Sequence, residues 1–224
     1  MVLSHVPPIE GTTGLVVDVS GNQPNVDFAV AKRDGGVVAA FLKATEGATY
    51  LDPSFLSHYD KAAAAGLRIG VYHFGTARPA ADQVGNFVNA VKRVAGSFDH
   101  LVPVLDLEHN DPSPDNTMSP DLGVAWVEAF VKETGRQPMI YAGAYLRDQG
   151  GATDRPALAA GPLWLAAYLK APVVIPGWPN WTFWQFTGDR LGPWAGEVPG
   201  LGWCDQSLFN GDAAALDAFW PPAG

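Results

Sequence analysis

Two acidic residues, Asp106 and Glu108, follow an apolar run at 102–105. The run is typical of a buried strand, and side chains two residues apart on a strand point to the same face. Two acids at the end of an apolar strand are costly to place there without a partner. The pair suits acid–base chemistry on an acetal, in which one carboxyl donates a proton and another stabilises the developing positive charge. Alternatively, Asp106 caps the following loop and Glu108 is only solvated.

Polar residues also lie near the ends of the other predicted strands. They are Asp18, Lys43 with Glu46, His73 and Tyr141. The carboxyl ends of parallel strands meet at one edge of a sheet or barrel, and in such folds this edge carries the active site. The positions therefore predict a shared cleft. For two of them we favour a structural interpretation: Lys43 and Glu46 as an ion pair, and His73 as a hydrogen-bonded core residue.

The elements that position these residues alternate between strands and helices. Strands are predicted at 14–18, 37–42, 68–74, 102–108 and 138–141, and helices at 25–34, 53–66, 79–95 and 120–135. This alternation predicts parallel strands joined by right-handed crossovers, in an α/β sheet or barrel. Further strands at 163–168, 181–186 and 201–209 have no obvious helix between them, a closing helix is predicted at 213–219, and the segment at 144–161 has no assignment. A regular eightfold barrel is therefore not expected.

The composition is that of one ordinary globular domain. The chain has 224 residues, of which 47% are hydrophobic and 17% charged, enough for a single α/β barrel. The formal charge of −9 at pH 7 argues against a nucleic-acid partner or an anionic membrane surface, since both need basic groups. No apolar run approaches the roughly 18 residues of a membrane-spanning helix.

The single cysteine and the N-terminal residues show none of the usual signs of a secreted protein. Cys204 is the only cysteine, so an intramolecular disulfide is excluded, and we expect a buried, unreactive thiol. The first residues have neither a basic start nor a continuous apolar segment, so no secretory signal is expected.

Seven short motifs, in this order, resemble those of the family 25 glycoside hydrolases, the Chalaropsis-type lysozymes. They are VDVS at 17–20, LKATEG at 42–47, VYHF at 71–74, LDLE at 105–108, LWLAAY at 163–168, WQF at 184–186 and CD at 204–205. The resemblance extends from about residue 14 to 211. Two features depart from the family pattern. Cys204 stands where the family has an apolar, often β-branched residue, and His109 is an addition to which we give no role.

The resemblance implies an irregular, flattened β/α barrel of about eight strands and about five helices, in one catalytic domain over 1–224 with its core at about 14–220. It also implies hydrolysis of the β-1,4 bond between N-acetylmuramic acid and N-acetylglucosamine in bacterial peptidoglycan. Glu108 would be the proton donor, in an acidic pocket with Asp106, Asp18 and Asp205. The sugar subsites would be lined by Tyr72, Phe74, Tyr141, Trp164, Tyr168, Trp184 and Gln185.

The same resemblance implies no cofactor and no metal. Peptidoglycan is the expected partner, with no nucleic acid and no insertion into a membrane. The chain is expected to act as a monomer on the cell wall, either outside the cell or after release from a host cytoplasm as a phage-type lysin.

Two alternatives remain at this point. One is a glycan-binding module of the same fold with weak or no turnover, although all four acids are present. The other is a metal hydrolase that uses Asp18, His73, Asp106 and His109, although no His pair has helical ligand spacing. The mechanism also stays open: Asp106 could support an oxazolinium formed by the substrate's acetamido group, or a base could activate water. Crowding predicts that neighbouring charges, above all Asp106, raise the pKa of Glu108.

Overall fold

Eight strands close into a barrel in the computed structural model of the chain, which describes residues 5–220. The strands are β1 (Thr13–Val19), β2 (Val37–Glu46), β4 (Arg68–Phe74), β5 (Leu101–Asp106), β6 (Met139–Ala142), β7 (Leu163–Ala166), β8 (Phe183–Thr187) and β9 (Asp205–Phe209). Their order is β1-β9-β8-β7-β6-β5-β4-β2, and the pairing of β1 with β2 closes the ring. The predicted α/β barrel is confirmed. The ends of the predicted domain, residues 1–4 and 221–224, lie outside the described residues.

The barrel is mixed rather than wholly parallel. β9 is antiparallel to both of its neighbours, β1 and β8, whereas the pairs from β1–β2 through β7–β8 are parallel. A short additional strand, β3 (Tyr50–Leu51), pairs antiparallel with the end of β2. The parallel strands bring their carboxyl ends to one side of the barrel, as the alternation of strands and helices predicts.

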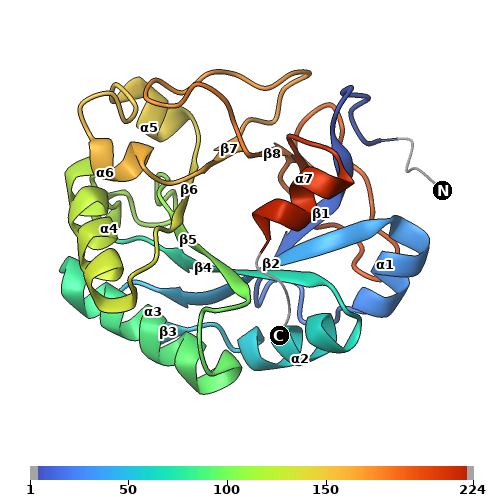
Figure 1. Cartoon of the computed structure of the whole chain (residues 1–224), viewed down its shortest axis with the longest axis horizontal. Helices are drawn as coiled ribbons and strands as arrows, with labels where there is room; N and C mark the ends of the chain where they lie inside the picture. The colour runs from blue at the N-terminus through green and yellow to red at the C-terminus, as the bar shows by residue number, and fades with distance from the viewer. Residues whose placement is uncertain (1–4, 221–224) are drawn as a thin grey trace.

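Seven α-helices lie within residues 5–220, compared with the expected five or so. They are α1 (Phe28–Gly35), α2 (Phe55–Ala64), α3 (Ala80–Ala95), α4 (Pro120–Thr134), α5 (Ala144–Asp148), α6 (Pro156–Ala159) and α7 (Ala213–Phe219), with a short 3-10 turn, η1 (Pro114–Asn116). The excess comes from α5 and α6, short helices of 5 and 4 residues in the segment without an assignment. Figure 1 shows α1 to α4 following one another around the outside of the strands, with α6 beside α4 and α5 beyond it. Within the described part of the chain, none of the helices has the length and apolar character needed to cross a membrane.

Local capping residues set the helix ends. α4 begins at Pro120, where the Ser119 hydroxyl accepts a hydrogen bond from the Leu122 N–H at 3.2 Å, and it ends at Gly135 with φ of 69°. α2 begins two residues later than predicted, because Asp52 is not its N-cap. The Asp52 carboxylate instead accepts the N–H groups of Ser54 and Gly21. These two hydrogen bonds of Asp52 therefore connect the loop that follows β1 to the start of α2.

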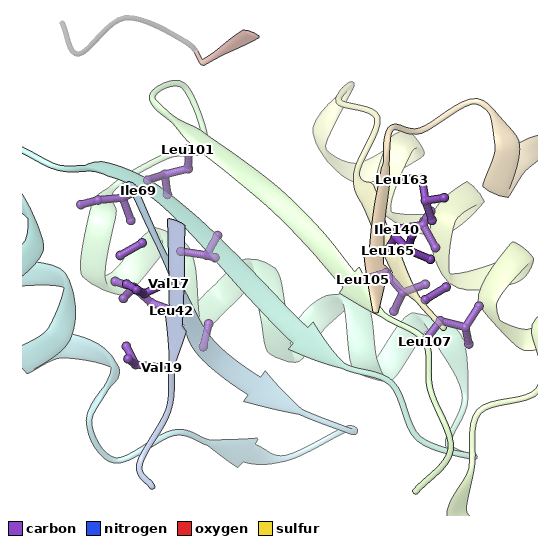
Figure 2. Packing of buried hydrophobic residues seen from close by; sticks show 14 of the residues in the cluster. Val17, Val19, Leu42, Ile69, Leu101, Leu105, Leu107, Ile140, Leu163 and Leu165 are labelled. Carbon is purple, nitrogen blue, oxygen red and sulfur yellow. The ribbon is translucent and has the colours of Figure 1, made fainter. Parts of the chain in front are cut away.

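The outward-facing strand residues form the larger part of the core, between the barrel and its helices. Figure 2 shows apolar side chains of this layer, including Val17, Leu42, Leu105, Ile140 and Leu165 from five different strands. Each of the five is at most 1% exposed. Burying one such side chain contributes about 1.5–3 kcal/mol. Because side chains alternate along a strand, the residues next to these five point into the barrel.

A second cluster of buried side chains, largely aromatic, fills the interior of the barrel. The Phe41 ring stacks on Trp164 with centroids 4.3 Å apart and meets Phe183 edge to face at 5.4 Å. Trp220, directly after α7, also contacts Phe41, and its indole N–H donates to the Ile69 carbonyl at 3.2 Å. These packed rings form a base beneath the side chains at the carboxyl ends of the strands.

Gly70 makes this packing possible, and we expect Gly70→Ala to lower the free energy of unfolding by ~1–3 kcal/mol through overpacking. A Cβ at this position would lie 2.0 Å from Cδ1 of Phe41. The matched control is Gly85→Ala in α3, where a Cβ has no neighbour within 4 Å. That change is expected to stabilise the protein by roughly 0.5–1 kcal/mol, because alanine favours the helix. Urea denaturation measures both, and equal stabilities would contradict the assignment of Gly70.

Candidate active site

A cavity of about 500 Å³ opens at the carboxyl ends of the strands. Nine of the eleven residues predicted for the site line it: Asp18, Tyr72, Phe74, Asp106, Glu108, Tyr141, Trp164, Gln185 and Asp205. They come from seven different strands and the segment directly after β5. The structure therefore brings together side chains that are up to 187 residues apart in the sequence, from Asp18 to Asp205.

Strand alternation places Asp106 and Glu108 in the same cavity. Leu105 and Leu107 are fully buried in the outer core, so Asp106 between them faces the interior of the barrel. β5 ends at Asp106, but the Leu107 N–H still donates to the Tyr141 carbonyl at 3.0 Å. Because this bond extends the pairing with β6, Glu108 keeps the strand-like direction and lines the cavity beside Asp106.

Asp18 and Asp205 face each other on adjacent antiparallel strands. Their Cα atoms are register partners on β1 and β9. The Gln185 amide nitrogen, on β8, donates to Asp18 Oδ2 at 2.9 Å and to Asp205 Oδ2 at 3.4 Å. The Asp189 N–H donates to Asp205 Oδ1 at 2.7 Å, from a residue with left-handed backbone (φ of 53°). The two carboxyls are thus held by side-chain and backbone donors.

Burial is the main reason why the Glu108 carboxyl holds its proton strongly. It raises the pKa of Glu108 to about 7, with further contributions from the charges of Asp205 and Asp111, while Lys43 and His109 act in the opposite direction. The expectation that neighbouring charge, above all that of Asp106, is the chief influence on the pKa of Glu108 is therefore corrected in favour of burial, although the two carboxyls still interact, since the charge of Glu108 raises the pKa of Asp106. Sequence shows that acids are close, but it does not show how deeply each is buried.

The pKa values of the other three acids are also raised. Burial, followed by the charge of Glu108, raises the pKa of Asp106 well above its usual value. Burial and the charge of Asp205 do the same for the pKa of Asp18. Burial raises the pKa of Asp205 to about 6, although the Asp189 N–H favours its ionised form. Asp106 Oδ1 is buried and has no hydrogen-bond partner among residues 5–220, so the protein stabilises the ionised form of this carboxyl only in part.

A second cavity of about 500 Å³ adjoins the first and shares Glu108 with it. Tyr168, which was predicted for the site, lines this second cavity, and its hydroxyl donates to Gln185 Oε1 at 2.9 Å. His109 also lies here, with Nδ1 2.7 Å from Asp111 Oδ1. A bound molecule that spans both cavities would pass directly over Glu108.

The position of Trp184 corrects the expectation that it contacts a sugar. Its side chain is 0% exposed and packs in the outer core, and its indole N–H donates to the Ala167 carbonyl at 2.7 Å. Trp184 precedes Gln185 on β8, so the two side chains point to opposite faces of the strand. Gln185 faces the cavity, and Trp184 therefore cannot.

The two structural interpretations made from sequence are confirmed. Lys43 Nζ lies 2.7 Å from Glu46 Oε2. His73 is 0% exposed, with Nδ1 2.8 Å from Thr45 Oγ1 and Nε2 3.2 Å from Gln83 Oε1. Burial lowers the pKa of His73 to about 4. Cys204 is also buried, and burial raises the pKa of its thiol, as expected for an unreactive cysteine.

The residues considered for a metal do not converge. His73 lies on the outer face of β4, whereas Asp18 and Asp106 face the cavity. His109 belongs to the second cavity. Among residues 5–220, no group of three or more His, Cys, Asp or Glu side chains is arranged to hold a metal ion. The proposed ligand set is therefore not assembled in this fold.

Several cavity residues escaped prediction. They are Val19, Ser20, Asn22, Gln23, Asp189 and Trp203, with Lys43 assigned only to an ion pair. Ser20 to Gln23 directly follow the strand that ends near Asp18, so their position after β1 was an available signal. Asp189 and Trp203 lie near the two ends of the segment that connects β8 to β9. Only the fold brings them to the cavity. The Arg190 guanidinium lies 4.5 Å from the centre of the Trp203 ring, which supports this part of the rim.

Comparisons with known proteins agree on one family. The family model "Glycosyl hydrolases family 25" matches residues 17–192. "Lysozyme M1" of Streptomyces globisporus is 32% identical over 214 residues, which cover 89% of this chain and 69% of that protein. The "N,O-diacetylmuramidase" of Chalaropsis sp is 36% identical over 182 residues, 75% of this chain and 85% of the relative.

A solved structure shows the same arrangement of strands and helices. The muramidase from Trichobolus zukalii superposes with a TM-score of 0.75 and 31% sequence identity. The match covers 93% of this chain and 99% of the other.

Proposed function

Because the chain belongs to family 25 of the glycosyl hydrolases, we propose that it is a muramidase, which hydrolyses the β-1,4 bond between N-acetylmuramic acid and N-acetylglucosamine in bacterial peptidoglycan. One observation carries the assignment of the chemistry. Glu108 is common to the two adjoining cavities, and three further acids line the first of them. A glycosidic bond placed over Glu108 would have one sugar in each cavity.

Glu108 is the proposed acid. Its pKa of about 7 keeps it protonated in mildly acidic solution, as a proton donor requires. Its proton passes to the glycosidic oxygen while the bond from this oxygen to the anomeric carbon breaks. The sugar in the second cavity then leaves as an alcohol, and positive charge develops on the sugar in the first cavity, which is lined by Asp18, Asp106 and Asp205.

Asp106 is the proposed partner of the substrate's acetamido group. Its carboxylate lines the first cavity and has unused acceptor capacity, because Oδ1 has no partner among residues 5–220, so the group suits the acetamido N–H. Accepting this hydrogen bond would turn the acetamido carbonyl oxygen toward the anomeric carbon and stabilise the oxazolinium that forms by its attack. Water then opens the oxazolinium, and its proton returns to the Glu108 carboxylate.

Asp205 and Asp18 are proposed to stabilise the charge and to tune Glu108. Asp205 exerts the largest effect of any neighbouring charge on Glu108. Its negative charge disfavours ionisation of Glu108 and therefore holds the proton on the acid. The pair lies across the cavity mouth from β5, on β1 and β9.

The rate of hydrolysis is expected to peak between about pH 6 and pH 7. The reaction requires protonated Glu108, with its pKa of about 7, and ionised Asp205, with its pKa of about 6. Asp106 must also be ionised, and a proton on Glu108 favours this because it removes the neighbouring charge that raises the pKa of Asp106. Activity therefore falls below the lower value as Asp205 gains a proton, and above the upper value as Glu108 loses one. The measurement is kcat/KM on purified walls from pH 4 to pH 9, and a rate that still rises above pH 8 would contradict this assignment.

Aromatic side chains are proposed to contact the sugars. Tyr72, Phe74 and Trp203 line the first cavity and are each partly exposed, so their faces can stack on the apolar side of a sugar ring. Trp164 is 1% exposed and lies beneath Tyr141 with ring centroids 4.9 Å apart. Trp164 therefore forms part of the base of the cavity.

The product identifies the reaction. Digested peptidoglycan is expected to carry new reducing ends on N-acetylmuramic acid. Reducing ends on N-acetylglucosamine would instead indicate a glucosaminidase, and free amino groups would indicate a peptidase or an amidase. A protein that binds walls without releasing any product would be a binding module of this fold. The proposed enzyme works as a monomer on the cell wall, either outside the cell or after release as a lysin.

EDTA is expected to leave the rate unchanged. In the proposed mechanism the acid is a carboxyl group and the developing charge is met by carboxylates, so no step needs a Lewis acid. The comparison is the initial rate with 5–10 equivalents or more of chelator and after dialysis. A rate abolished by EDTA and restored by zinc would favour a metal hydrolase.

A further inference from the structure

The carboxamide of Gln185 uses its full hydrogen-bonding capacity inside the protein. Its Nε2 donates to Asp18 Oδ2 at 2.9 Å and to Asp205 Oδ2 at 3.4 Å. Its Oε1 accepts the hydroxyls of Tyr141 at 2.7 Å and Tyr168 at 2.9 Å. A carboxamide has two N–H donors and two lone pairs on its oxygen. With a side chain that is 1% exposed, Gln185 has neither a polar group nor surface left for a sugar.

The four contacts fix the direction of the amide. Burial raises the pKa of both tyrosines, so their hydroxyls stay protonated and can donate to Oε1. In the reversed orientation the amide oxygen would face Asp18 and Asp205, and acceptors would oppose acceptors. The tyrosine hydroxyls therefore hold the N–H groups toward the two carboxyls.

The Asp18–Asp205 pair needs such a donor. The two residues are register partners on adjacent antiparallel strands, and like charges directly opposite each other are destabilising. Gln185 Nε2 is within hydrogen-bond distance of both carboxyls. A donor between two acids favours their charged forms and also fixes the direction in which each points.

We propose that Gln185 is a positioning residue, which holds the Asp18–Asp205 pair in place and favours its ionised form, and that it does not bind the sugar. The expectation of a sugar contact from Gln185 is thereby replaced. The inference rests on the proposed function in one respect, because the charged pair is taken to hold the proton on Glu108.

Gln185→Met removes the donor and keeps a side chain of similar length. Without the donor, Asp18 and Asp205 should take up protons at higher pH, so the acidic limb of the kcat/KM profile should move up by about one pH unit, as expected for losing a hydrogen bond to a charged group. With less negative charge nearby, the basic limb of Glu108 should move down. The profile should narrow, kcat at its peak should fall roughly 10²-fold, and KM should change less than about twofold.

Gln185→Glu provides the opposite test on the basic limb and keeps the proposal testable if Gln185→Met is too unstable to purify. The introduced carboxylate is nearly isosteric and adds negative charge beside the pair. It should move both limbs to higher pH, since like charges disfavour ionisation of every acid around it. The control is Gln83→Met, which removes a fully buried, hydrogen-bonded glutamine on α3. That variant should lose stability with both limbs unmoved.

A second readout separates this proposal from the proposed function. Carbon-13 NMR titration of the Asp18 and Asp205 carboxyls should show both titrating at higher pH in Gln185→Met than in the wild type, whether or not walls are hydrolysed. Carboxyl titrations that do not move, together with a raised KM and an unchanged pH profile, would show that Gln185 contacts the sugar instead. A wild type that hydrolyses no wall would overturn the proposed function alone.

Discussion

Glu108→Gln is expected to lower the rate of peptidoglycan hydrolysis by at least ~10²-fold, the scale of general acid catalysis. The amide keeps the size of the side chain but cannot supply the proton to the glycosidic oxygen. The measurement is kcat on purified walls, followed by turbidity and by release of reducing sugar. Glu133→Gln on α4, at an exposed residue 3.7 Å from Lys92, is the matched control and should keep the wild-type rate. Wild-type lysis by Glu108→Gln would remove Glu108 from the mechanism.

The same variant should be more stable than the wild type at alkaline pH. Burial raises the pKa of Glu108 from 4.5 to about 7, so the folded state binds its proton more tightly than the unfolded state. Stability from this group is therefore greatest below pH 4.5 and is lost as the pH rises to 7. Glutamine does not ionise, so the difference in unfolding free energy should grow across this window to a few kcal/mol. Thermal unfolding at pH 4 and pH 8 measures it, and a loss of stability at pH 8 would indicate damage to the fold.

The alternation of side chains explains why so much of the site could be predicted from sequence. Asp18 lies between two buried valines, and Asp106 lies between two buried leucines. A polar residue at such a position must face the other side of the strand. Parallel strands then bring these positions to one end of the barrel. Apart from the short strand β3, the order of strands and α-helices up to residue 142 follows from the same local signals, and the bounds of β4 and α7 agree with their predicted ranges.

Three features of the structure depend on long-range contacts that short motifs do not contain. Trp184 and Gln185 share one motif, yet they face opposite sides of β8. The motif by itself therefore led to the wrong prediction that Trp184 contacts a sugar. Gln185 bonds to residues 167 and 44 positions away in the sequence, Asp18 and Tyr141. The short helices α5 and α6 have too few residues for a periodic pattern. In each case the tertiary packing decides the outcome.

Spacing alone did not show that Asp205 also acts on the acid. Asp106 is adjacent to Glu108 on the same strand face, and the charge of Glu108 raises the pKa of Asp106. The charge of Asp205, on β9, also raises the pKa of Glu108. Asp205→Asn and Asp106→Asn should therefore both move the basic limb of the pH profile to lower pH. A basic limb that does not move in one of these variants would show that this aspartate does not influence the acid.

Asp106→Asn is expected to lower kcat by on the order of 10²–10³-fold, the effect of removing one preorganised group that stabilises transition-state charge. An amide oxygen can still accept the acetamido N–H, but the negative charge opposite the developing oxazolinium is lost. KM should therefore change little. The control is Asp60→Asn on the exposed side of α2, which should leave kcat unchanged. An Asp106→Asn enzyme with normal kcat would show that the charge of this carboxylate has no part in the reaction.

Stability should change in the opposite direction from activity. Burial raises the pKa of Asp106, so the folded protein binds this proton more tightly than the unfolded chain, and stability falls as the pH rises from the usual Asp value of about 3.9 toward the raised one. Asparagine has no such dependence, so Asp106→Asn should unfold at a higher temperature than the wild type at pH 7, with the gap closing toward pH 4. A variant that is both slower and more stable would mean that the fold tolerates a buried, unpartnered carboxylate because catalysis needs it. A variant that is slower and less stable at pH 7 would instead assign Asp106 a structural role.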